Sequence, residues 1–550
     1  MDKQLTTLIV GGVAGGATTA ARLSRLGAGR RIVIIERGGY VSFANCGLPY
    51  YIGDVIPEQS SLILASPELF RSRYGIEVLL NHEAISIDAA SSTLLVRNLA
   101  TGEELPIPYD ELVLSPGAAP FRPPMPGIDL AGVMTLRTVP DAEAVKAYIG
   151  RHNVRSALIV GAGFIGLEVA ENLRELGLEV TLVEGAPHIL PPLDTHMSGY
   201  VSRLLEERGL RIETGKIAQG IRRTEDGRLQ AYADAWESPA ADMILLSIGV
   251  RPETSLARTA GIETGKTGGI IVDTQMKTSV PGIWAVGDAV EVVSRVTGRP
   301  MLLALAGVAQ KQARIAAASI MGRQEEFHGV LGTSVLRIFG TTVAMTGMNP
   351  DTLARLGYED DYEYIDAHPY QHVTYYPGAT PIHMRLVYRK KDGLILGATA
   401  IGENDAARKI DVIAALMSKN GTVYDLEEAE MCYSPQEGAA KDAVNMVGMA
   451  AANNLRGLHP LAHAGDIGRP GTFMLDVREV AETVRQPFAG AVNIPLSQLR
   501  SRWQELPGDR TILVLCQVGV RGYNATRFLC NMGLDARNLS GGYITMSLGS

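Results

Sequence analysis

The feature that most constrains the fold is a strand–glycine turn–helix–strand pattern that occurs twice. In the first copy an apolar strand ends at Val10, residues 11–16 read GGVAGG, and Glu36 follows the next strand. In the second copy residues 161–166 read GAGFIG and Glu184 takes the acidic position. Such glycines let the backbone approach a pyrophosphate at a helix N-terminus, and the acid accepts from a ribose hydroxyl. The pattern therefore predicts two nucleotide-binding α/β domains.

The two turns differ in detail. Val13 stands where the middle glycine of the first turn is expected, whereas the second turn has all three glycines in register. Two such units predict two nucleotides, and flavin with nicotinamide is the natural pair because one delivers hydride and the other holds it. Glu184 would repel a 2′-phosphate by several kcal/mol at an effective dielectric of about 20. The sequence therefore favours NADH, with NADPH as the alternative.

Length and composition narrow the remaining choices. A chain of 550 residues predicts roughly three to four domains. A net charge of −8 and a pI of about 5.8 favour neither nucleic acid nor an anionic membrane. Four cysteines are too few for a disulfide framework and indicate a reducing, cytoplasmic setting. The start of the chain runs into a strand without a signal-peptide pattern, no apolar stretch is long enough to span a membrane, and we assign no metal site.

Cys46 is the first cysteine that we expect to be reactive. It lies in residues 42–51, SFANCGLPYY, where Tyr50 and Tyr51 occupy the places of a second cysteine four or five residues on. An internal disulfide is thus excluded at this spacing, and the second sulfur must come from the substrate. A thiolate is the nucleophile in such chemistry, so we expect a helix N-terminus, a tyrosine hydroxyl and the flavin to lower the pKa of Cys46.

Cys516 is the second cysteine that we expect to be reactive. It follows an apolar strand at 512–515 and precedes a helix at 523–532. The loop between them could aim backbone N–H groups at the sulfur and so stabilise a thiolate or persulfide anion. Arg521 would add positive charge and select anionic donors. Cys432 and Cys530 are interpreted as structural.

The motifs identify a family by resemblance. Residues 1 to about 450 resemble the flavin-dependent pyridine nucleotide–disulfide oxidoreductases with a single active-site cysteine, and the Cys46 segment is similar to that of coenzyme A-disulfide reductases. Residues 114–118 (LSPGA), 248–252 (IGVRP) and the segment ending at Asp288 are similar to three further signatures of that family. Asp288 is expected to cap a helix and to face the ribityl chain of the flavin.

The end of the chain resembles a rhodanese domain. Residues 475–478 (LDVR), 490–495 (GAVNIP) and the Cys516 loop carry this resemblance, in which Asp476 and Arg478 form a buried pair. The whole chain is similar to reductase–rhodanese fusions, including NADH-dependent persulfide reductases. The implied fold class is α/β, with two Rossmann-like domains, an α+β dimerisation domain and a C-terminal α/β rhodanese domain. The expected bounds are 1–125 and 255–329 for FAD, 126–254 for NAD, 330–452 for dimerisation, 453–470 for a linker and 471–550 for rhodanese.

The resemblance also implies site residues. The catalytic set comprises Cys46, Cys516, Tyr375, Tyr433 and Arg521, with the tyrosines completing the active site of a partner subunit in a homodimer. The FAD set comprises Gly11, Val13, Ala14, Gly16, Glu36, Arg37, Ser115, Gly117 and Asp288. The NAD set comprises Gly161, Gly163, Phe164, Ile165, Gly166, Glu184 and Gly249. Thr18, Arg22, Arg25, Ser42, Asn45 and Lys441 are the expected contacts of a coenzyme A-type substrate, and coenzyme A itself is a candidate ligand.

The function expected from these residues is FAD-dependent NADH:persulfide or polysulfide oxidoreduction. Cys46 would reduce sulfane sulfur from coenzyme A- or glutathione-type persulfides to sulfide, and Cys516 would carry sulfur. Three alternatives stay open: a coenzyme A-disulfide reductase, an NADH oxidase or peroxidase with a sulfenic acid on Cys46, and a sulfurtransferase whose flavin part senses redox state. The sequence does not indicate whether Cys516 passes sulfur to Cys46 directly.

Overall fold

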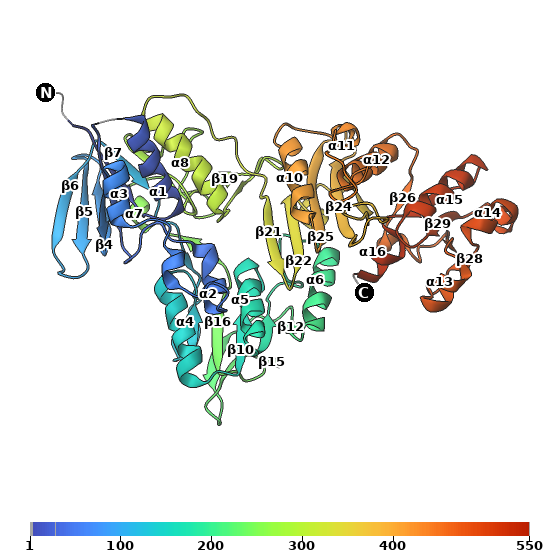
Figure 1. The fold of residues 1–550 in the computed structure, drawn as a ribbon, viewed down its shortest axis with the longest axis horizontal. Coiled ribbons are helices and arrows are strands. Elements are labelled where there is room, and N and C mark those ends of the chain that lie inside the picture. The colour runs from blue at the N-terminus through green and yellow to red at the C-terminus, as the bar shows by residue number, and fades with distance from the viewer. Residues whose placement is uncertain (1–3, 28, 549–550) are drawn as a thin grey trace. The chain divides into compact units, whose positions relative to one another are not determined.

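The computed structural model describes residues 4–27 and 29–548 (Figure 1). The chain forms two compact units. The first unit contains residues 1–185 and 209–330, and the second contains residues 186–208 and 331–550. No helix in the described part of the chain is long and apolar enough to cross a membrane.

The first unit begins with a parallel five-stranded sheet in the order β18-β7-β1-β2-β3. Helices α1 and α8 pack against each other beside it (Figure 1), and an antiparallel sheet, β4-β5-β6, belongs to the same unit. The strands are β1 (Thr6–Val10), β2 (Arg31–Glu36), β3 (Glu77–Leu80), β4 (His82–Asp88), β5 (Thr93–Asn98), β6 (Glu104–Pro108), β7 (Glu111–Leu114) and β18 (Ile283–Ala285), and the helices are α1 (Ala14–Leu26), α3 (Pro67–Tyr74), α7 (Ser255–Thr259) and α8 (Ala306–Ile320).

A second parallel sheet in this unit has the order β12-β11-β10-β16-β9. Its central strands are buried along their length, as expected when both faces of a parallel sheet are covered. The strands are β9 (Val133–Thr135), β10 (Ser156–Val160), β11 (Glu179–Val183), β12 (Arg211–Glu213) and β16 (Met243–Leu246), with α4 (Val139–His152) and α5 (Phe164–Glu175). Smaller strands are β8 (Ala118–Pro120), β13 (Gly220–Arg223), β14 (Leu229–Ala233), β15 (Trp236–Glu237), β17 (Val250–Pro252), β19 (Val292–Val293) and β20 (Pro300–Met301).

The second unit begins with an antiparallel sheet in the order β21-β22-β25-β24-β23, against which α10 and α12 pack. The strands are β21 (Ser334–Ile338), β22 (Thr341–Gly347), β23 (Tyr362–Ala367), β24 (Ile382–Arg389) and β25 (Ile395–Gly402). The helices are α6 (Thr195–Glu207), α9 (Pro350–Arg355), α10 (Ala406–Met417), α11 (Val423–Glu428) and α12 (Ala443–Leu455). This mixture of an antiparallel sheet with helices is the α+β domain that the sequence predicts.

The last sheet is parallel throughout, in the order β26-β30-β29-β27-β28. Leu461 and Ala462, which the sequence assigned to a linker, form β26 and pair with β30. The strands are β26 (Leu461–Ala462), β27 (Thr472–Asp476), β28 (Val492–Asn493), β29 (Thr511–Leu515) and β30 (Ala536–Leu539), with helices α13 (Val480–Arg485), α14 (Leu496–Arg502), α15 (Val520–Asn531) and α16 (Gly542–Leu548).

A buried polar cluster joins the last sheet to the antiparallel sheet within the second unit. The Arg385 guanidinium donates to Asp366 (Nε to Oδ1, 2.7 Å) and to Asp194 (Nη1 to Oδ1, 2.6 Å), and all three side chains are nearly inaccessible. His368 Nε2 lies 2.7 Å from Thr545 Oγ1 of α16, and Ser540 Oγ accepts from the Asp366 N–H at 2.7 Å. The two domains are therefore fixed to each other by specific, fully buried hydrogen bonds.

The predicted fold class is confirmed, and so is the order of its elements. The helix after the first glycine turn begins at Ala14, because the last residues of the turn themselves take up helical geometry. One expectation is wrong: no helix begins at Asp288, which lies in a turn, and the next helix in the chain is α8.

Candidate active site

The first glycine turn is shaped as a nucleotide site requires. Gly11 has φ +90, and a Cβ on Gly16 would lie 1.8 Å from the carbonyl oxygen of Gly11. Helix α1 can therefore approach the strand only with glycine at residue 16. The Glu36 carboxylate receives the N–H of Gly12 at 2.7 Å and that of Gly38 at 2.7 Å. It is thus held at the end of β2, at the turn, where a ribose hydroxyl could be bound.

The second turn repeats this geometry. Gly161 has φ +105, a Cβ on Gly166 would lie 2.0 Å from the Gly161 carbonyl oxygen, and the Ala162 N–H donates to Glu184 Oε2 at 2.7 Å. Gly163 is the N-cap of α5 and has no side-chain capping bond. Both turns thus leave space and a helix N-terminus for a pyrophosphate, so their residues fit two dinucleotides.

Asp288 lies at the carboxyl end of the first sheet, three residues after β18. Arg137 Nη2 lies 3.4 Å from its Oδ2. Burial raises the pKa of Asp288, and Arg137 opposes that shift. Gln312 of α8 accepts the Gly287 N–H at 2.8 Å, but its buried Nε2 has no hydrogen-bond partner. A buried amide without an acceptor costs free energy, so this position fits a polar ligand such as a flavin.

Cys46 lies in a short 3-10 helix, Asn45–Gly47, that continues into α2 (Leu48–Ile52). Leu48 and Ile52 are buried, and α2 packs against α4 and α5 of the second sheet. A Cβ on Gly47 would come within 2.6 Å of Leu62 Cδ2, so a larger residue directly after Cys46 would require the Leu62 side chain to shift. The cysteine side chain itself is accessible to solvent.

The groups around Cys46 are mostly acidic. Burial by the surrounding protein raises its pKa, as do the carboxylates of Glu168 and Asp288, whereas Arg137 lowers it. The expectation of a lowered pKa is therefore wrong for the protein groups. Glu168 of α5 accepts a hydrogen bond of 3.4 Å from the Tyr50 hydroxyl. Burial raises the pKa of Glu168 to about 7, and burial together with Glu168 raises the pKa of Tyr50 to about 12.

The other expected contacts of the first unit fall into two groups. Arg22 of α1 pairs with Glu325 at 3.6 Å, while its Nε is buried without a partner, and Arg25 lies over the Tyr74 ring. Ser42 has the left-handed φ of 50, with its N–H on the Gly12 carbonyl. The remaining residues of the flavin and substrate sets lie near the first sheet: Val13 is the N-cap of α1, Ala14 and Thr18 belong to α1, Arg37 pairs with Glu253, and Ser115 and Gly117 follow β7. The remaining residues of the NAD set lie near the second sheet: Phe164 and Ile165 are the first residues of α5, and Gly249 precedes β17.

Tyr375 and Tyr433 come from separate loops of the second unit and meet at their hydroxyls, 2.9 Å apart. Both rings are exposed, at 72% and 48%. The shared hydrogen bond raises the pKa of Tyr375. Cys432, interpreted as structural, is also exposed, and so is Lys441. The structure thus brings the two predicted tyrosines together as an outward-facing pair.

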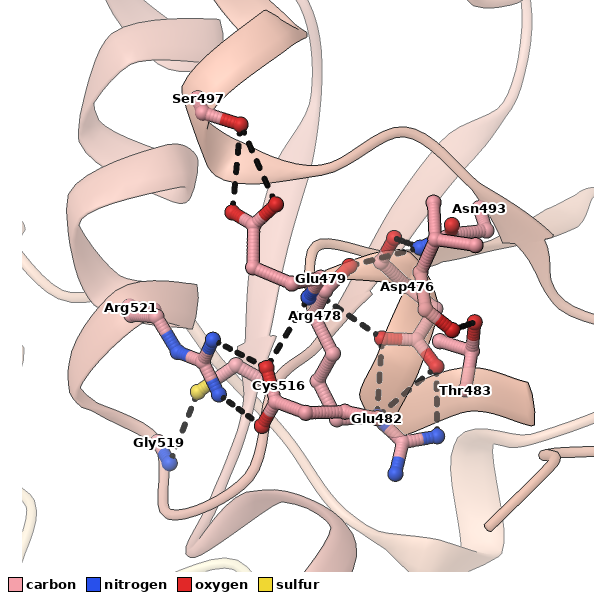
Figure 2. A network of polar contacts seen from close by, with 11 residues as sticks. Asp476, Arg478, Glu479, Glu482, Thr483, Asn493, Ser497, Cys516, Gly519 and Arg521 are labelled. Atoms are coloured by element: carbon pink, nitrogen blue, oxygen red, sulfur yellow. Dashed lines mark hydrogen bonds and ion pairs between the residues drawn. The ribbon is translucent and has the colours of Figure 1, made fainter. Parts of the chain in front are cut away.

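Cys516 follows β29 directly and is completely buried. Its Sγ accepts the N–H of Gly519, at 3.1 Å, and Gly519 has φ +90 at the N-cap of α15 (Figure 2). Helix α16 contacts the start of this loop, because the Tyr543 N–H donates to the Cys516 carbonyl at 2.7 Å. The predicted arrangement of loop N–H groups is therefore represented by one direct donor to sulfur.

Arg521 lies beside Cys516 in Figure 2, but its guanidinium is engaged by Glu482. Its two Nη atoms donate to the two carboxylate oxygens at 2.6 and 2.7 Å. This contact is the main reason that the pKa of Glu482 falls to about 2. Asp476 and Arg478 form the buried pair that the sequence predicts, at 2.7 Å.

Sequence reasoning missed three charged residues of these sites: Glu168, Arg137 and Glu482. Glu168 shares its helix with two other glutamates and Glu482 follows Glu479 by one helical turn, so nothing in the sequence distinguishes them. Their role follows only from the tertiary fold, which places Glu168 beside Tyr50 and Glu482 beside Arg521. Among residues 4–27 and 29–548, no group of three or more histidines, cysteines or acids is arranged to hold a metal ion.

Two glycine turns on two parallel sheets, with an accessible thiol just before a helix that packs against α4 and α5, define a two-nucleotide oxidoreductase. Comparison with known proteins agrees. Residues 5–313 match the family described as pyridine nucleotide-disulphide oxidoreductase, and residues 335–443 match its dimerisation domain. The chain belongs to this family, whose members use a flavin and NAD(P)H. Residues 461–545 match the rhodanese-like domain.

Individual relatives cover most of the chain. The coenzyme A disulfide reductase of Staphylococcus aureus (strain JH9) is 34% identical over 449 residues, which is 81% of this chain and 99% of that protein. The structure of reduced Bacillus anthracis CoADR-RHD has a TM-score of 0.95 and 40% identity, covering 100% of this chain and 98% of the other. An NAD-dependent persulfide reductase from A. fulgidus has a TM-score of 0.91 and 32% identity, covering 98% and 100%.

Proposed function

We propose that the protein is an FAD-dependent NADH:persulfide oxidoreductase. The observation that carries this proposal is the presence of two different sulfur sites in one chain. Cys46 is an accessible thiol with tyrosines at positions 50 and 51, and Cys516 is a buried thiol whose sulfur accepts a backbone N–H. The similar persulfide reductase of A. fulgidus supports it.

The lone thiol sets the chemistry at Cys46. Its thiolate attacks the sulfane sulfur of R–S–SH, so that a new S–S bond forms to give Cys46–S–SH while the S–S bond of the donor breaks with release of RS⁻. A bound flavin with NAD(P)H supplies the two electrons that return Cys46 to the thiolate and free the sulfur as sulfide. Burial, Glu168 and Asp288 raise the pKa of Cys46, whereas Arg137 and a backbone hydrogen bond favour the thiolate.

The finer assignments follow from the same residues. Glu36 and Glu184 would accept from the ribose hydroxyls of FAD and of NADH, and the Glu184 carboxylate disfavours the 2′-phosphate of NADPH. The dimerisation domain supports a homodimer, in which the exposed pair of Tyr375 and Tyr433 would complete the active site of the partner subunit. Free cysteines in the described chain fit the cytoplasm.

A second candidate is coenzyme A-disulfide reduction, in which Cys46 attacks R–S–S–R and releases one thiol. The Staphylococcus aureus relative carries this activity in its name. Arg22 presents a buried Nε without a partner, and Arg25 is exposed one turn further along α1, so both could meet phosphates of coenzyme A. The same residues would serve a coenzyme A persulfide, so they do not separate the two candidates.

Anaerobic assays of NADH oxidation and sulfide release distinguish persulfide reduction from coenzyme A-disulfide reduction. We expect glutathione persulfide and coenzyme A persulfide to be turned over with one sulfide released for each NADH. Fast turnover of coenzyme A disulfide with little sulfide from either persulfide would favour the second candidate. Rapid NADH consumption with O₂ or peroxide alone, with sulfenate on Cys46, would indicate an oxidase or peroxidase. Negligible NADH turnover with full sulfur transfer by Cys46→Ser would indicate a sulfurtransferase.

A further inference from the structure

The guanidinium of Arg521 is the group at the Cys516 site that an oxyanion would bind, but it is not available. Glu482 engages both of its Nη atoms, at 2.6 and 2.7 Å, in the bidentate geometry that a sulfonate group would otherwise occupy. Glu482 is itself fixed, because its Oε2 also receives the Glu479 N–H at 3.0 Å. The Glu482 carboxylate is therefore fixed by two groups, the Arg521 guanidinium and the Glu479 N–H (Figure 2).

The charge around the sulfur is also unfavourable for a dianion. Figure 2 shows the Arg521–Glu482 pair beside Cys516, with Glu479 and the buried pair of Asp476 and Arg478 in the same network. Three acids and two arginines leave this network one negative charge before Cys516 ionises. Ser497 holds the Glu479 carboxylate at 3.2 and 3.3 Å, which keeps that charge in place.

We propose that Glu482 determines the donor specificity of the Cys516 site by occupying Arg521, so that the site takes sulfane sulfur from thiol persulfides and discriminates against thiosulfate. This inference rests on the proposed function of Cys516 as a sulfur acceptor. The persulfide group of R–S–S⁻ carries one negative charge, on the sulfur that is transferred. Thiosulfate carries two, and its three oxygens need donors of their own.

Both transfers are balanced. With a thiol persulfide, the Cys516 thiolate bonds to the outer sulfur, the S–S bond of the donor breaks, and RS⁻ leaves with the electron pair. With thiosulfate, the same attack releases sulfite. In each case the product is Cys516–S–S⁻, formed on the Sγ atom that accepts the Gly519 N–H. Cyanide then removes the outer sulfur as thiocyanate and regenerates the thiolate. The two donors therefore differ only in the leaving group that the rim of the site must accommodate.

Thiocyanate formation from thiosulfate and from glutathione persulfide, without NADH, tests the inference. Glu482→Gln should raise kcat/KM for thiosulfate about 10-fold, because a freed guanidinium can hydrogen-bond the oxyanion. The value for glutathione persulfide should change by less than about threefold. Glu505→Gln is the matched control, since it removes the acid of another ion pair on the same domain, that of Glu505 with Arg502. It should leave kcat/KM unchanged for both donors.

The double variant Glu482→Gln/Arg521→Gln provides a second test in case the single variant does not fold. It removes both charges of the pair, so the ratio of kcat/KM for the two donors should stay within about threefold of the wild-type ratio. A fall of 10-fold or more in thiosulfate relative to persulfide would show that Arg521 already binds the oxyanion, and would overturn the inference. Equal thiosulfate rates for a folded Glu482→Gln and the wild type would overturn it too. If the wild type fails to release sulfide with NADH, only the proposed function is contradicted, because the thiocyanate assay runs without NADH and does not use the reductase domains.

Discussion

Replacing Glu168 with glutamine should make the first unit more stable at alkaline pH than the wild type. Burial raises the pKa of this carboxyl from 4.5 to about 7. An acid with a raised folded-state pKa contributes fully below its unfolded pKa, and that contribution is lost as the pH rises through the folded value. Glutamine is neutral at every pH and can still accept the Tyr50 hydroxyl.

The magnitude follows from the two pKa values. Each unit between them is worth about 1.4 kcal/mol of unfolding free energy. Because its pKa is raised, Glu168 destabilises the folded wild type by about 1 kcal/mol near pH 5.5 and by about 3 kcal/mol near pH 8.5. The advantage of Glu168→Gln over the wild type should therefore grow by up to about 2 kcal/mol between these pH values, less some screening by solvent.

Urea unfolding followed by flavin fluorescence at both pH values measures this difference. Comparing the change with pH, rather than a single ΔG, cancels any effect of the substitution on packing. Glu175→Gln, at the exposed end of the same helix, is the control and should show no growth of the difference with pH. A Glu168→Gln advantage that stays constant or shrinks towards alkaline pH would refute the reasoning, because Glu168 would then titrate at an ordinary pKa.

Three further outcomes are expected. Asp366→Asn should destabilise the second unit by about 3–5 kcal/mol in denaturant unfolding, because it breaks a buried pair with Arg385, whereas an unchanged midpoint would contradict that role. The pKa of buried His368 is lowered to about 3, so the stability of the second unit should fall as the pH drops below about 6.5, by about 2 kcal/mol at pH 5, and near-UV circular dichroism of a His368→Gln variant should show a weaker dependence. Gly16→Ala should abolish flavin retention, measured by visible absorbance, because its Cβ would lie 1.8 Å from a backbone oxygen, whereas Gly150→Ala, with open space around it, should retain flavin.

The parts that could be predicted from the sequence are those with a local physical signature. The glycine turns at 11–16 and 161–166 require close backbone contacts, which is why their composition predicts α1, α5 and the acids that follow. Likewise the resemblance of the LDVR segment to a rhodanese domain implies a buried pair of Asp476 and Arg478, which the structure contains.

What could not be predicted depends on contacts between distant segments. Tyr50 and Glu168 are 118 residues apart, and Glu482 and Arg521 are 39 residues apart. No periodicity or spacing reports such pairs, so the raised pKa of Cys46 and the engagement of Arg521 were both missed. The turn at Asp288 was misjudged for a related reason, since an aspartate after a strand is equally compatible with a cap and with a turn.

The central claim is that Cys46 is the thiol through which persulfide sulfur is reduced. Sulfide release from glutathione persulfide with NADH, measured anaerobically on single-cysteine variants, tests it most directly. We predict that Cys46→Ser loses at least about 100-fold in rate, while Cys432→Ser, which removes the other exposed thiol, keeps the wild-type rate. Sulfide release by Cys46→Ser at a rate near that of the wild type would contradict the claim.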